Sequence, residues 1–103
     1  MSEAEIVRSC LHILRVEGIM SWRNNTGGTR GGKLRFGLPG SSDIFAILPD
    51  GRFLAIECKT EKGKLSELQS VFMHQVQESG GEALVIGDPG ELIEYLKDWR
   101  KRE

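Results

Sequence analysis

Apolar residues recur at helical spacing in three segments, which predicts three helices. The first runs from Glu3 to about Glu17 and begins with a Ser-x-x-Glu capping box. The second runs from Leu65 to Ser79 and is closed by a glycine pair, and the third starts at Asp88–Glu91, where a capping aspartate precedes a proline. The side chains expected to face the core are Ile6, Val7, Cys10, Ile13, Leu14, Leu68, Val71, Phe72, Val76, Leu92, Ile93, Leu96 and Trp99.

Shorter apolar segments predict four strands. They span Ile19–Arg23, Ile44–Leu48, Arg52–Lys59 and Ala83–Ile86. Turn residues at Pro49–Gly51 join the second and third strands into a hairpin, and a loop with six glycines, Asn24–Gly40, separates the first two. The order α-β-β-β-α-β-α predicts an α/β fold in which helices flank one mixed sheet, and we expect residues 1–103 to form a single domain.

Composition excludes several classes of protein. The chain is 39% hydrophobic and 28% charged, which is ordinary for a globular protein. No apolar run approaches the roughly 18 residues of a membrane span and the N-terminus lacks a signal pattern, so we expect a cytoplasmic protein without a membrane partner. Cys10 and Cys58 fall at core-facing positions and are expected to be free and buried rather than paired in a disulfide.

The net charge of −1 argues against a generally basic nucleic-acid binder, but the charges are unevenly distributed. No acid occurs between Gly18 and Ser42, and further lysines follow the strand that ends at Lys59. The basic residues expected to contact phosphates are Arg23, Arg30, Lys33, Arg35, Lys62 and Lys64. Trp22, beside Arg23, is expected either to anchor the core or an interface or to face DNA.

Glu57 and Lys59 carry the chemistry that the pattern suggests. They are two residues apart on an otherwise apolar strand, so their side chains share a face at about 6–7 Å along the chain. Asp43 stands at the start of the neighbouring strand. Two carboxylates and one ammonium suit a divalent cation with a positioned water. The alternatives are an ordinary aspartate at the start of a strand and a structural Glu57–Lys59 ion pair.

Two further polar residues have ambiguous roles. Glu3 falls in line with the buried stripe of the first helix, so it is either a third carboxylate near the metal or a favourable acid at a helix N-terminus. Gln69 completes a second capping box with Ser66, yet its helix follows soon after Lys59, which places its first turn close to the site.

The motifs Gly40-Ser41-Ser42-Asp43 and Glu57-Cys58-Lys59, followed by Gln69, resemble those of the PD-(D/E)XK nuclease superfamily. Four further features point to one family within this superfamily. They are the Glu-x-Glu-Ile helix start, the Trp-Arg-Asn-Asn strand end, the basic glycine-rich loop and Gly80-Gly81. They are similar to the virus-type replication-repair nuclease (VRR-NUC) domain in its short, stand-alone phage or bacterial form. The resemblance implies a restriction-endonuclease-like core. The chain departs from the pattern at Ser42, where the superfamily motif has proline, and at Val7, where relatives often carry glutamine.

The resemblance also implies roles for individual residues. Asp43 and Glu57 would bind Mg²⁺ or Mn²⁺, with Glu3 assisting at the metal. Lys59 would position or deprotonate the attacking water, and Gln69 would support the site from the adjoining helix. The implied reaction hydrolyses DNA and leaves 5′-phosphate and 3′-hydroxyl ends. Relatives of this size look like homodimeric resolvases of branched DNA, so the expected substrate is a four-way (Holliday) junction.

Other functions are weighed against this one. The segment Gly27–Lys33 has the glycine and lysine spacing of a phosphate-binding Walker loop, but Leu34 replaces the required Ser or Thr and no helix follows, so no nucleotide cofactor is expected. The remaining rivals are a monomeric nicking or flap nuclease, a non-catalytic DNA-binding module on the nuclease fold, and a helix–sheet interaction domain with a solvated ion pair. Paired incisions and metal dependence distinguish the junction resolvase from the first two.

Overall fold

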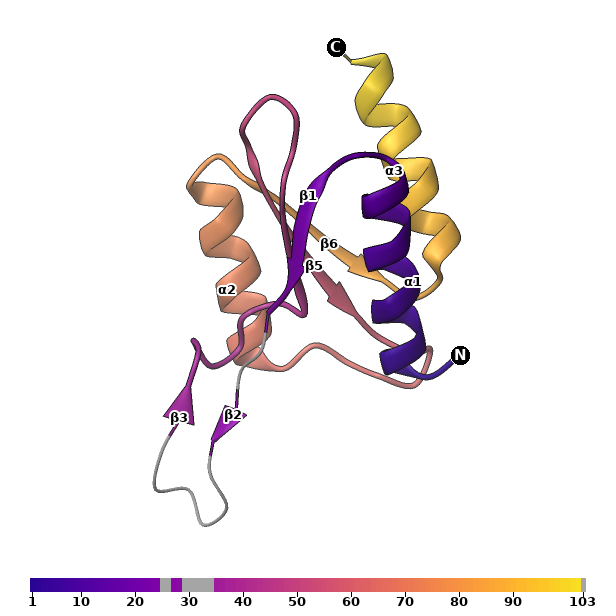
Figure 1. The fold of residues 1–103 in the computed structure, drawn as a ribbon. Helices are drawn as coiled ribbons and strands as arrows, with labels where there is room; N and C mark the ends of the chain where they lie inside the picture. Colours follow the sequence, from indigo (N-terminus) through magenta and orange to yellow (C-terminus); the bar gives the residue numbers. More distant parts are fainter. Residues whose placement is uncertain (25–26, 29–34, 103) are drawn as a thin grey trace.

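A computed structural model describes residues 1–24, 27–28 and 35–102, and of residues 27–28 and 35–36 only the backbone is described. The elements are α1 (Glu3–Val16), β1 (Met20–Arg23), β2 (Gly27–Gly28), β3 (Arg35–Phe36), β4 (Ile44–Ile47), β5 (Phe53–Cys58), α2 (Glu67–Glu78), β6 (Glu82–Ile86) and α3 (Pro89–Lys101). The main sheet has the order β1-β4-β5-β6 (Figure 1). Its β1–β4 and β4–β5 pairs are antiparallel and its β5–β6 pair is parallel, so the predicted mixed α/β fold is confirmed.

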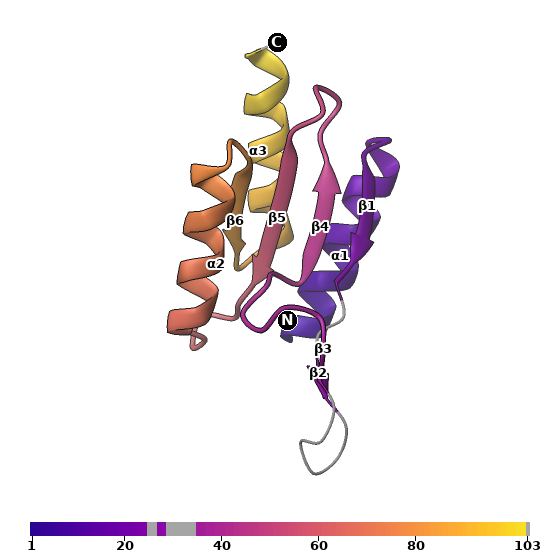
Figure 2. The ribbon, with the colours of Figure 1, turned by 90° about the vertical axis from the view of Figure 1, so that its left-hand side faces the viewer.

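The helices form layers on the two faces of this sheet. α1 and α3 lie side by side on one face, and α2 lies on the other (Figure 1). Figure 2 shows that α2 covers the β5–β6 half of its face and leaves β4 and β1 uncovered. The core fills the space between the sheet and α1 with α3, and it includes Leu14, Ile44, Ile56 and Leu96. Cys10 and Cys58 belong to this core and are free, as predicted.

The long loop predicted at Asn24–Gly40 contains a small hairpin, so the prediction was wrong there. In β2 and β3, Gly27 pairs with Phe36 and Gly28 with Arg35, and the hairpin extends away from the main sheet (Figure 1). Strands are recognised by alternating apolar residues, and a glycine pair provides none. The sequence pattern therefore gave no signal for β2.

The apolar stripe of α2 was predicted correctly at Phe72 and Val76 but wrongly at its other two positions. Leu68 and Val71 are exposed, whereas Met73 and Val76 are buried. The side of α2 that faces the sheet runs through positions 69, 72, 73 and 76, at the spacing of one helical face. The first position on this side is the polar Gln69. A search for apolar residues at helical spacing therefore selected Leu68 and Val71, which lie next to the true inner side.

The other helices are closer to expectation. In α3 the predicted stripe is buried except at Ile93, which is exposed. In strand β5, Leu54, Ile56 and Cys58 belong to the core, and Ala55 and Glu57 on the opposite face are buried as well. None of the helices in the described part of the chain is long and apolar enough to cross a membrane.

Candidate active site

The pairing of β4 with β5 places Asp43 and Glu57 opposite each other. Ile44 pairs with Ile56 in the antiparallel register, and the two acids are the next residues outward on their strands. Directly opposed residues have Cβ atoms about 4.5–5.5 Å apart on the same face. Asp43 Oδ2 also accepts a hydrogen bond of 2.8 Å from the backbone N–H of Cys58. The two carboxylates predicted from the sequence therefore meet at one end of the sheet.

Asn24 fixes the segment that leads into Asp43. Its backbone N–H donates to the Asp43 carbonyl oxygen at 2.8 Å. Its side-chain Nδ2 donates to Ser41 Oγ at 2.7 Å and to the Ser42 carbonyl oxygen at 2.9 Å. Sequence reasoning missed this residue, although the Trp-Arg-Asn-Asn motif marked its position.

Gly40 brings the same segment against α2. Its φ of +82° is in the left-handed region, and a Cβ placed there would lie 2.6 Å from Leu68 Cβ. This glycine therefore makes room for the first turn of α2.

Gln69 combines the two roles that the sequence left as alternatives. Its Oε1 accepts the backbone N–H of Ser66 at 2.8 Å, which completes the capping box. Its Nε2 donates to Glu57 Oε1 at 3.0 Å. Because one amide group makes both bonds, the start of α2 and the orientation of Glu57 are fixed together.

The environment of Glu57 disfavours its charge. The residue is only 2% exposed. Burial raises the pKa of Glu57 to about 8, with further contributions from the Asp43 charge, a hydrogen bond to Asp43 and the more distant Glu3 charge. Lys59 acts in the opposite direction, but its Nζ lies 3.9 Å from Glu57 Oε1 and does not compensate. A dominant ion pair with Lys59 would lower this pKa, so Lys59 alone does not offset the cost of ionising Glu57.

The donor set of the site fits a hard divalent cation. When Glu57 is ionised, its buried Oε2 has no hydrogen-bond partner among the described residues, and an orphaned buried oxygen is costly unless something pairs with it. Mg²⁺ prefers oxygen ligands and is commonly held by one or two carboxylates with several waters. Asp43 and Glu57 meet that requirement. The pKa of the neighbouring Cys58 thiol is raised by its hydrogen bond with Cys10 and by burial, which disfavours a thiolate ligand.

The remaining predicted site residues are Glu3 and six basic residues. Within the described residues no three His, Cys, Asp or Glu side chains form a cluster that could hold a metal, and Glu3 is exposed, so its role at the metal stays a prediction. Three of the predicted phosphate contacts, Arg23, Lys62 and Lys64, are exposed. Arg30, Lys33 and the side chain of Arg35 lie outside the described part. Contact of these residues with DNA stays a prediction.

Comparison with known proteins identifies the family of this chain. The sequence profile of the VRR-NUC domain matches residues 4–87. The chain belongs to the VRR-NUC domain family. A solved structure of a VRR-NUC domain shares the fold, with a TM-score of 0.71 and 18% sequence identity over 92% of this chain and 94% of that chain. No curated protein matches this chain in sequence.

Membership of the VRR-NUC family implies a nuclease of the PD-(D/E)XK type that acts on DNA. The matched residues include Asp43, Glu57, Lys59 and Gln69, which the structure brings together, whereas Glu3 lies just before them. The individual roles of these residues stay predictions.

Proposed function

We propose that this VRR-NUC domain is a Mg²⁺- or Mn²⁺-dependent DNA endonuclease that resolves four-way junctions as a homodimer. The observation that carries the proposal is the arrangement of Asp43 and Glu57. The two carboxylates are opposed across two strands, one of them has a buried oxygen without a partner among the described residues, and Lys59 stands 3.9 Å away. This is the charge pattern of a site that holds a cation and a water beside a phosphate.

Each residue of the site has a separate role in the proposed hydrolysis. Asp43 and Glu57 would hold the cation, which when bound polarises a phosphoryl oxygen and stabilises the leaving 3′ oxygen. Lys59 holds the attacking water in line with the scissile bond and offsets the negative charge that develops on the phosphate. The water oxygen forms a bond to phosphorus, the bond from phosphorus to the 3′ oxygen breaks, and the 3′ oxygen leaves with a proton. Gln69 keeps Glu57 in place through its 3.0 Å hydrogen bond.

The preference for branched DNA and the dimer rest on the resemblance to short VRR-NUC domains. The basic residues Arg23, Lys62 and Lys64 reach the surface and suit contacts to phosphates, which position DNA without reading its sequence. A four-way junction has two equivalent strands to cut, and a two-fold dimer presents two equivalent sites. Paired symmetric incisions follow from that match of symmetries.

The test is cleavage of a labelled synthetic four-way junction with Mg²⁺ or Mn²⁺, beside linear duplex and flap controls. The native protein and Asp43→Asn are compared, and Asp98→Asn on the exposed side of α3 serves as the matched control. We expect paired cuts on the junction that disappear only with Asp43→Asn. Single cuts on the flap substrate, together with a monomer in sedimentation experiments, would indicate a flap nuclease instead of a resolvase. Binding without cutting in either metal would leave a DNA-binding module.

A further inference from the structure

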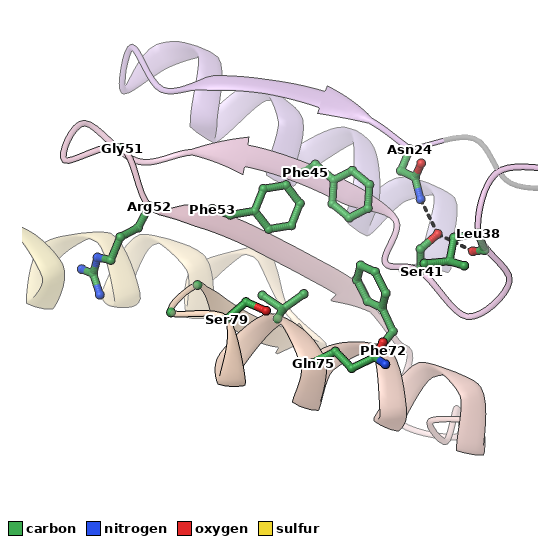
Figure 3. A pocket seen from close by; sticks show the side chains of 13 residues that line it. Asn24, Leu38, Ser41, Phe45, Gly51, Arg52, Phe53, Phe72, Gln75 and Ser79 are labelled. Carbon is green, nitrogen blue, oxygen red and sulfur yellow. Dashed lines mark hydrogen bonds between the residues drawn. The ribbon is translucent and has the colours of Figure 1, made fainter.

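A cleft of about 770 Å³ opens on the sheet face that α2 only half covers (Figure 3). Phe45 and Phe53 enter it from β4 and β5, and Phe72 enters it from α2. The ring centroid of Phe45 lies 4.9 Å from that of Phe53 and 5.9 Å from that of Phe72. Trp22, which is 41% exposed, meets Phe45 edge-on at 6.1 Å. We call this hollow the aromatic cleft.

The aromatic cleft continues directly from the candidate active site. Phe45 is two residues beyond Asp43 on the same face of β4, which is about 7 Å along the strand. Phe72 follows Gln69 by one turn on the inner side of α2. Asn24 belongs to both places, because it lines the cleft and holds the backbone of Asp43. About 7 Å corresponds to one or two nucleotides of a stacked DNA strand, at roughly 3.4 Å each.

The lining of the cleft suits a flat aromatic ring with polar edges. The rings form its floor, and the amides and hydroxyls of Asn24, Ser41, Gln75 and Ser79 surround it. Among the described residues that line it none is acidic, and the charged one, Arg52, is already paired with Asp50 and Glu82. The volume lies in the roughly 300–1,000 Å³ range of pockets for small molecules. A polyanion that approaches Asp43 therefore meets no repulsion from the lining.

We propose that the aromatic cleft binds one unpaired nucleobase next to the phosphate that is cut. The inference rests on the proposed function, since the base comes from the branched DNA substrate. Bases at the point of strand exchange lack the continuous stack of a duplex and unpair at lower cost, and a base stacked on aromatic side chains is recognised without regard to its identity. The cleft would thus let the nuclease select DNA shape, because a fully paired duplex keeps its bases stacked inside.

The test measures binding without divalent metal, so that a failed cleavage reaction does not affect it. The probes are a duplex with one unpaired 2-aminopurine and the same duplex fully paired. Gln75→Trp fills the cleft from α2, and Gln77→Trp places the same side chain about 200° around the helix as the control. We expect Gln75→Trp to lose about 5- to 150-fold in affinity for the unpaired probe, the range that base–aromatic stacking supplies, and to bind the paired duplex as before. Gln77→Trp should match the native protein on both.

Three results would overturn the proposal. Equal affinity of native protein and Gln75→Trp for the unpaired probe would show that no base enters the cleft. An equal loss on both probes would assign the effect to contacts with the DNA backbone. A change of oligomeric state in sedimentation, with unchanged preference between probes, would make the cleft an interface between two copies of the chain.

A second measurement on the native sequence guards against a folding defect of Gln75→Trp. Protein labelled with 4-fluorophenylalanine should show fluorine shifts for Phe45, Phe53 and Phe72 when the unpaired probe is added, and smaller shifts with the paired duplex. Unchanged signals with both probes would contradict the proposal.

Discussion

Replacing Glu57 by glutamine should make the metal-free protein less sensitive to high pH. The pKa of Glu57 is about 8 in the folded protein against an ordinary value of 4.5. Because the folded-state pKa is raised, protonation of Glu57 favours folding. That stabilisation is fully present below about pH 4.5 and is lost as the pH rises through about 8. At 1.36 kcal/mol for each pH unit the difference corresponds to at most about 5 kcal/mol, and we expect about 2–5 kcal/mol.

Glu57→Gln isolates this effect because it imitates the protonated side chain. The substituted side chain would keep an oxygen to accept the Nε2 of Gln69 and would gain an amide to donate to Asp43. Urea unfolding in EDTA, followed by circular dichroism between pH 5 and pH 9, should show the native free energy of unfolding falling with pH. The variant should stay nearly level over this range. Glu94→Gln, at an exposed position on α3, is the matched control and should follow the native curve. Parallel curves for the native protein and Glu57→Gln would refute the reasoning.

Three further perturbations test the neighbouring parts of the site. Mg²⁺ at about 100 times its dissociation constant should raise the native free energy of unfolding at pH 8 by about 2.7 kcal/mol, and a similar gain in Glu57→Gln would place the cation elsewhere. Gly40→Ala should cost about 2–4 kcal/mol in urea unfolding, because it combines a positive φ with a clash against Leu68. Gly18→Ala, at a similar φ of +73° in open space, should cost only about 1–2 kcal/mol, and equal costs would disprove the clash. Gln69→Glu keeps an acceptor for the capping box but sets a third carboxylate beside Glu57, so DNA cleavage should fall about 10- to 100-fold with little change in melting temperature. A large drop in melting temperature would show that the amide serves mainly the helix.

The fold could be predicted from the sequence where one face of an element is purely apolar. α1 and α3 have such faces against the closed side of the sheet, and their starts carry clear capping residues. α2 does not, since its inner side begins with Gln69, a polar residue that contacts Glu57. The burial of Leu68 and Val71 was therefore predicted wrongly. The hairpin of β2 and β3 could not be predicted because its strands are two residues long and one of them consists of glycines.

The candidate site could be predicted in its residues but not in its contacts. Glu57 was recognisable as a carboxylate within an apolar strand, and its burial is confirmed. Its position opposite Asp43 depends on the register of β4 and β5, which a hairpin sequence alone does not specify to one residue. The contribution of Asn24 depends on hydrogen bonds across 17 and 18 positions in the chain, and no local pattern reveals these.

One face of the sheet carries most of the stabilising core, and the other carries the aromatic cleft. The face toward α1 and α3 holds nearly all of the apolar core, and this burial must offset the cost of a buried glutamate whose pKa is raised. The other face is only half covered, so the carboxylates and the aromatic cleft stand at the margin of α2, where the proposed DNA strand would approach. Substitution of an exposed residue on the cleft side of α2, such as Gln75, should therefore change DNA preference at little cost in stability. Substitutions in the core should lower stability without changing which DNA is preferred.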